Sequence, residues 1–235
     1  MTVRGWQPMR AAMRGAMVAA GVVSVALPRV GMGQSAAESA YERVAAAWSR
    51  QQTLEARFDQ KITNPLLGRT ATSRGTFLQQ KPDKVSITFT DPDGDRIVGD
   101  GRSLWVYLPS STPGQVLKLP ANADGAVVAD LLRQLFDVPR EAFTITGGDA
   151  VTVEGRATRR AVLTPKAGQR VAFSKATLWL DEREARPVRV QVIDGQGVDR
   201  TITLTSWSPN AELDRKAFVF SVPKGVKVVT KLPGM

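Results

Sequence analysis

Alternation between apolar and polar residues is the feature that most constrains how this chain can fold. From position 85 to position 90, Val85, Ile87 and Phe89 alternate with three Ser or Thr residues. Side chains two apart in a strand lie on the same face, so the pattern predicts a half-buried strand with one apolar and one wettable face. It leaves open whether the apolar face seals a filled core or lines a space that a ligand can enter.

The same alternation recurs along most of the chain. It is clear in "TLEARFDQKIT" (53–63), "TSRGTFLQQ" (72–80), "RRAVLTPK" (159–166) and "DRTITLTSW" (199–207), with Gly, Pro and Asp turns between the segments. The expected connection between the first two is "NPLLG", and we expect "AFTITG" and "AVTVEG" to be separate strands. Short alternating strands at even spacing predict an antiparallel barrel or sandwich in one domain, residues 34–235.

Two segments have the spacing of helices instead. In Ser35–Gln52, apolar residues including Tyr41, Val44 and Trp48 recur at steps of three and four. In Gly125–Pro139, residues including Leu131 and Leu135 make a similar stripe that ends before a proline. We therefore predict an α+β, mainly β, fold with two accompanying helices.

The first 33 residues have the composition of a targeting segment. Four arginines and no acidic residue occur there, and the apolar run "GAMVAAGVVSVAL" precedes Pro28 and several small residues. This order predicts a secretory signal peptide at 1–33, cleaved after Gly33 or Ala37; an uncleaved anchor is the alternative. The apolar run is shorter than the roughly 20 residues of a membrane-spanning helix. We therefore expect an exported protein.

Composition argues against most catalytic chemistries. The chain has no His and no Cys, so the usual general base, zinc ligands, thiol chemistry and a lipidated cysteine are absent. The formal charge is +10, but the basic residues are scattered rather than interleaved with aromatics, which argues against nucleic-acid binding. An acidic partner or anionic lipid headgroups suit such a surface better.

Two acidic clusters are candidate sites by composition. "DPDGD" (91–95) begins like a calcium loop, but Arg96 stands where glycine is required, so a hairpin turn explains it better. "DERE" (181–184) could offer paired carboxylates, but it follows a strand directly and has basic neighbours, as an exposed turn would. We therefore predict no enzyme activity, no metal site and no cofactor.

Several segments together resemble a known family. "LEARFDQ", "RGTFLQQKPDKVSITFTDP", "IVGDGRSLWVYLP" and "AFVFSVPKGVKVV" follow one another in the order and spacing found in the periplasmic outer-membrane lipoprotein carrier proteins, the LolA family. The resemblance covers most of Trp48 to Val229. It implies an incomplete antiparallel β-barrel whose helices form a lid over an apolar interior that receives lipoprotein acyl chains.

The resemblance also implies partners and a binding surface. An inner-membrane releasing transporter would load the carrier, and an outer-membrane acceptor would unload it; the lack of Cys favours the soluble carrier over the lipidated acceptor. We expect a monomer. A lipid or glycolipid carrier, or a stress-sensor interaction module with the same half-barrel, remains an alternative. The expected acyl-chain contacts are Trp48, Phe58, Phe77, Val85, Ile87, Phe89, Leu131 and Leu135.

The sequence departs from the family at one implied position. The family arginine before a proline, implied to hold the lid by hydrogen bonds, is Lys81 here. Lysine lacks the planar fork of a guanidinium group, so the exchange is not conservative where several acceptors must be bonded. Lys81 is the candidate latch, with Arg57 and Arg74 as alternatives; an ordinary solvated turn lysine is the simpler interpretation.

Overall fold

The structure is a computed structural model of the 235-residue chain, and it describes residues 1–2, 35–121 and 131–230. Apart from its first two residues, the predicted signal peptide lies outside the described residues. So does the first part of the predicted helix 125–139, including Val127 and Val128.

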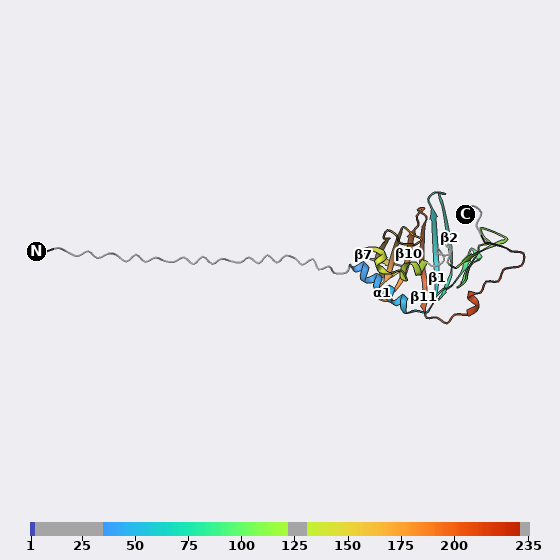
Figure 1. Ribbon diagram of the computed structural model, residues 1–235, viewed down its shortest axis with the longest axis horizontal. Coiled ribbons are helices and arrows are strands. Elements are labelled where there is room, and N and C mark those ends of the chain that lie inside the picture. Colours follow the sequence, from blue (N-terminus) through green and yellow to red (C-terminus); the bar gives the residue numbers. More distant parts are fainter. Residues whose placement is uncertain (3–34, 122–130, 231–235) are drawn as a thin grey trace. The chain divides into compact units, whose positions relative to one another are not determined.

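Twelve strands and two α-helices account for most of the described residues (Figure 1). The helices are α1 (Ala36–Arg50) and α2 (Leu131–Phe136), and two short 3₁₀ helices are η2 (Arg140–Ala142) and η3 (Arg215–Phe218). The strands are β1 (Thr53–Asn64), β2 (Arg69–Gln80), β3 (Lys84–Asp91), β4 (Asp93–Asp100), β5 (Ser103–Tyr107), β6 (Gln115–Pro120), β7 (Phe143–Val153), β8 (Arg156–Pro165), β9 (Lys175–Asp181), β10 (Arg186–Ile193), β11 (Asp199–Pro209) and β12 (Lys227–Val229).

All twelve strands belong to one open sheet. Its order is β12-β6-β5-β4-β3-β2-β1-β11-β10-β9-β8-β7, so β12 and β7 are the edges and the sheet is not closed into a barrel. Every pairing is antiparallel except that of β12 with β6, which is parallel. The predicted mainly β fold with an incomplete antiparallel barrel is therefore confirmed, with one parallel pair at an edge.

Local chemistry explains where α1 begins. The Ser35 hydroxyl accepts a hydrogen bond from the Glu38 backbone N–H at 3.2 Å, and the Glu38 carboxylate accepts one from the Ser35 N–H at 3.0 Å. This reciprocal capping satisfies two N–H groups that have no partner within the helix. The apolar stripe of α1, with Tyr41, Val44 and Trp48 buried, packs against β7 to β10 (Figure 1).

Strand β1 shows how alternation builds the core. Leu54, Ala56 and Phe58 are buried, whereas Arg57 between them is exposed. The strand pairs with β2 on one side and with the distant β11 on the other. The predicted connection "NPLLG" (64–68) between β1 and β2 is confirmed as a turn at 65–68, and Asn64 is the last residue of β1.

Two local expectations need correction. The two strands expected at 142–155 are one strand, β7, whose pairing with β8 shifts register between Gly147 and Ala150. The face of β3 expected to be wettable is covered at Ser86, which is 1% exposed. The segment containing η3 packs on β3 and β4, and Phe218 is buried there, so the outer face of the sheet carries a second small core.

Candidate binding cavity

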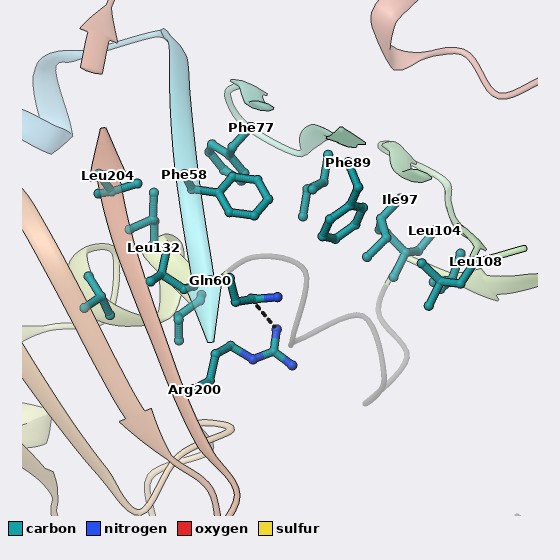
Figure 2. Close-up of a pocket in the computed structure, with 15 residues that line it drawn as sticks. Phe58, Gln60, Phe77, Phe89, Ile97, Leu104, Leu108, Leu132, Arg200 and Leu204 are labelled. Atoms are coloured by element: carbon teal, nitrogen blue, oxygen red, sulfur yellow. Dashed lines mark hydrogen bonds between the residues drawn. The ribbon is translucent and has the colours of Figure 1, made fainter. Parts of the chain in front are cut away.

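An apolar cavity of about 280 Å³ lies on the inner face of the sheet (Figure 2). It spans the central strands and reaches α2. Its lining residues are Phe58, Gln60, Phe77, Ile87, Phe89, Ile97, Leu104, Val106, Leu108, Leu131, Leu132, Val190, Arg200, Ile202 and Leu204.

Strand register explains why these side chains meet. Phe58 lies opposite Leu204 on β11, and Phe77 lies opposite Ile87 on β3, so each pair shares one face of the sheet. Phe58 and Phe89 are in edge-to-face contact, with ring centroids 5.8 Å apart. The wall is thus held in place by cross-strand pairs within a continuous sheet.

A glycine allows β3 to approach β2 closely beneath this wall. A Cβ atom built on Gly75 would lie 2.3 Å from the carbonyl oxygen of Thr88 and 3.0 Å from the Cα of Phe89. Gly75 lies opposite Phe58 in β1 and opposite Phe89 in β3, where the pairing changes register. The absence of a side chain here therefore sets the position of two aromatic wall residues.

The structure places the predicted contact residues in two groups. Phe58, Phe77, Ile87, Phe89 and Leu131 line the cavity. The other three belong to the core around it: Trp48, Val85 and Leu135 are 2%, 5% and 0% exposed and are not on its wall.

Ten of the fifteen lining residues were not among the predicted contacts; eight of the ten are apolar, and the other two are the polar residues Gln60 and Arg200. The Arg200 guanidinium donates to the Gln60 side-chain oxygen at 3.5 Å, and burial lowers the pKa of Arg200 below its ordinary value. The alternating pattern could have identified Arg200 as a lining residue, because Arg200, Ile202 and Leu204 follow one another at two-residue steps on the same face of β11.

Lys81, the latch candidate, contacts the end of α1 and the segment just after α2. Its ammonium group donates to the backbone carbonyl of Trp48 at 2.6 Å and lies 4.9 Å from the centroid of the Trp48 ring. It is also 4.0 Å from the Asp137 carboxylate, which accepts a hydrogen bond from the Trp48 indole at 2.5 Å. These contacts connect the end of β2 to the end of α1 and to the residue just after α2.

The two alternative latch residues point elsewhere. Arg74 is 3.6 Å from the Asp91 carboxylate on the neighbouring strand, with both side chains more than half exposed. Arg57 is exposed on β1. Neither residue has a described contact with a helix, so Lys81 is the better candidate of the three.

The helix α2, which contributes to the cavity wall, is joined to α1. The Tyr41 hydroxyl of α1 donates to the Leu135 carbonyl of α2 at 2.7 Å. Rings of Tyr41 and Trp48 lie 5.9 and 5.8 Å from the ring of Phe136. α2 therefore reaches the cavity through Leu131 and Leu132 while its other side is fixed to α1.

The acidic clusters have structural roles. Asp95 is 5% exposed and accepts hydrogen bonds from the backbone and hydroxyl of Ser110. Asp181 accepts from the backbone N–H groups of Arg183 and Glu184 in the turn after β9. Within residues 35–121 and 131–230, no cluster of three or more His, Cys, Asp or Glu is arranged to hold a metal. No helix in the same ranges is long and apolar enough to cross a bilayer.

The sheet is open, helices pack on its inner face, and an apolar cavity lies between the sheet and α2, an arrangement that suits a protein that binds an apolar ligand. The profile of the family "Outer membrane lipoprotein carrier protein LolA" matches residues 49–221. The chain belongs to the LolA family.

Individual relatives agree with this assignment. An outer-membrane lipoprotein carrier protein of Chromobacterium violaceum is 30% identical over 210 residues, which cover 89% of this chain and 96% of the relative. A protein of the same name from Pseudomonas aeruginosa is 27% identical over 194 residues, 81% of this chain and 88% of the relative. An uncharacterized conserved protein of Thermus thermophilus has a similar fold, with a TM-score of 0.51, 14% identity, and coverage of 84% of this chain and all of the other.

Proposed function

We propose that this protein is a periplasmic carrier that takes the acyl chains of lipoproteins into its apolar cavity and moves them from the inner to the outer membrane. Residues 1–33 act as a cleaved signal peptide, and residues 34–235 form the carrier domain. An inner-membrane transporter loads the protein and an outer-membrane acceptor unloads it. Binding and release require no covalent chemistry and no cofactor.

The observation that carries this proposal is the apolar cavity in a chain of the carrier family. Thirteen of its fifteen lining side chains are aliphatic or aromatic. A surface of this kind gains free energy by removing hydrocarbon from water, about 0.8 kcal/mol per buried CH₂ group. One long acyl chain therefore gains on the order of 10 kcal/mol before the costs of opening are subtracted.

The size of the cavity implies that it must open further. Its volume of about 280 Å³ lies just below the roughly 300–1,000 Å³ of typical small-molecule sites. A long chain enters only if wall side chains or the covering helices move. The free energy spent on this movement keeps the net affinity moderate. A carrier needs moderate affinity because it must release its cargo.

Phe89 provides the direct test. Phe89→Asp places a carboxylate on the wall, where an ionised group without a partner is strongly unfavourable. We expect a fluorescent fatty-acyl probe to bind the purified wild type and to bind this variant at least about tenfold more weakly, which corresponds to 1.4 kcal/mol. The neighbouring Thr88 is exposed, so Thr88→Asp is the matched control and should bind normally.

Absence of probe binding by the wild type at micromolar concentration would contradict the proposal. Equal weakening by Phe89→Asp and Thr88→Asp would also count against this cavity as the site. The nature of the cargo needs a second measurement, mass spectrometry of molecules that co-purify from the envelope. Lipoproteins support the carrier; free lipids alone would restrict the cargo to lipids, and one integral membrane protein alone would indicate a sensor module.

A further inference from the structure

Arg200 is an unusual component of an otherwise apolar wall. It lies on the inner face of β11 four residues from Leu204, about 13 Å along the strand. Figure 2 shows its side chain directed toward Gln60, at the end of the cavity away from Phe77. A charged group in this position costs free energy because water is partly excluded from it.

The described residues compensate this charge poorly. Among them the guanidinium has one hydrogen bond, the contact of 3.5 Å to Gln60, which is at the limit for such a bond. Gln60 is itself fixed by donating to the Ser73 hydroxyl at 2.9 Å. Asp194 is the carboxylate whose charge acts on Arg200, but its oxygen already accepts from the backbone N–H groups of Gln196 and Val198. Most of the five N–H donors of Arg200 thus have no hydrogen-bond partner among residues 35–121 and 131–230.

Resting on the carrier function proposed above, we propose that the cavity binds amphiphiles whose acyl chain ends in an anionic group, and that Arg200 binds this group. A guanidinium pairs with carboxylate or phosphate through two parallel hydrogen bonds. The acyl chain then extends from Arg200 past Ile202 and Leu204 toward Phe58 and Phe77. Both anions have the required chemistry, so a free fatty acid and a phospholipid are the two sources to distinguish.

The experiment compares three ligands with the same acyl chain: a fatty acid, a lysophosphatidic acid and a neutral monoacylglycerol. Each displaces a neutral fluorescent acyl probe from the purified, delipidated protein at a pH near 8, where both acids are ionised. A charge-assisted hydrogen bond contributes about 1.5–3 kcal/mol, so we expect an anionic ligand to bind the wild type about 10-fold to 100-fold more tightly than the neutral one.

Arg200→Met keeps an unbranched, flexible side chain, although a shorter one, and removes the charge. It should abolish the preference for the anion while leaving the affinity for the monoacylglycerol within about twofold, a change well below the tenfold that corresponds to 1.4 kcal/mol. Arg57→Met makes the same replacement at an exposed position and should keep the preference. Arg200→Gln repeats the test with a polar side chain should the Met variant not fold.

The outcomes separate this inference from the carrier function. Preference for the fatty acid alone, for the phosphate alone, or for both supports the inference and identifies the source. Equal affinity of the wild type for all three ligands, or a preference that persists in Arg200→Met, overturns it while leaving the carrier function intact. Failure of all three ligands to bind overturns both.

Discussion

Lys81 connects the sheet to its covering helices with a single cation. Its hydrogen bond to the Trp48 carbonyl lies at the C-terminus of α1, where a positive charge also interacts favourably with the helix dipole. The side chain is only 17% exposed, so its interactions are weakly screened compared with those of a surface lysine. These two facts make Lys81 a candidate for the function that the resemblance implies for an arginine.

Lys81→Met tests this function, because methionine fills similar space without the charge. We expect the free energy of unfolding to fall by about 1–2 kcal/mol, the sum of one partly buried hydrogen bond and a cation–π contact. Amide exchange in the last turn of α1 should also become faster. Denaturant unfolding and hydrogen exchange measure these effects.

The control for Lys81→Met is Lys61→Met, at an exposed position of β1. Lys81→Arg should keep stability within about 0.5 kcal/mol, because the guanidinium can reach both the Trp48 carbonyl and Asp137. If Lys81→Met and Lys61→Met behaved alike, Lys81 would be an ordinary solvated lysine and the latch would have to be sought elsewhere.

At the scale of elements, α1 and α2 act as one covering unit because of Tyr41. Burial, followed by the negative charges of Glu141 and Glu42, raises the pKa of Tyr41 above its ordinary value of about 10. The folded state therefore favours the neutral phenol, which donates to Leu135. Its contribution to stability is complete below the unfolded pKa, and it is lost as the pH rises from about 10 toward the folded value.

We expect the free energy of unfolding to decrease more steeply above pH 10 in the wild type than in Tyr41→Phe, by up to about 1.4 kcal/mol per pH unit for this one group. At pH 7 the same variant should be less stable by about 1–2 kcal/mol, because the buried Leu135 carbonyl loses its donor. Tyr107→Phe keeps Tyr41 and should keep the wild-type slope. Identical slopes in the wild type and Tyr41→Phe would show that Tyr41 ionises as easily folded as unfolded.

The close pairing of β2 with β3 at Gly75 can also be tested at the scale of elements. Gly75→Ala forces a Cβ against the Thr88 carbonyl of β3, so the two strands must separate or shift. Overpacking of this kind costs about 1–3 kcal/mol, and displacement of Phe89 should weaken probe binding as well. Gly195→Ala is the matched control, since a Cβ there would meet nothing within 4 Å. Equal stability of the two variants would contradict the close approach.

Local sequence pattern predicted the strands and the aromatic residues on their apolar faces, because both depend on residues two apart, whereas the cavity that these residues line was implied by the family resemblance. Phe58, Phe77 and Phe89 were found in this way. The pattern does not state which distant strands pair, and the neighbour of β1 in the sheet, β11, lies more than a hundred residues away. Arg200 was therefore not connected with Phe58, and the burial of Ser86 beneath the C-terminal segment had no local signal.

At the scale of the whole molecule, the cavity is too small for the cargo that the carrier function requires. The free energy gained by filling the existing cavity and the free energy spent on enlarging it should therefore be measurable separately. We consider saturated fatty acids of increasing length. While the chain fits the existing space of about 280 Å³, each added CH₂ group should increase affinity about fourfold, the equivalent of 0.8 kcal/mol. Beyond that length each CH₂ must also displace wall side chains or helices, and the increment should fall.

Phe77→Ala should increase the chain length at which the affinity gained per CH₂ group begins to fall. Removing the ring enlarges the cavity, so the fourfold increments should continue to longer chains, although the free protein should lose about 3–5 kcal/mol of stability. Phe220→Ala removes a ring that stacks on Trp105 outside the cavity wall and should leave this chain length unchanged. Displacement titrations across the series measure both. A constant increment through the longest chains in wild type would mean that the helices open without cost, and the closed cavity would then not determine affinity.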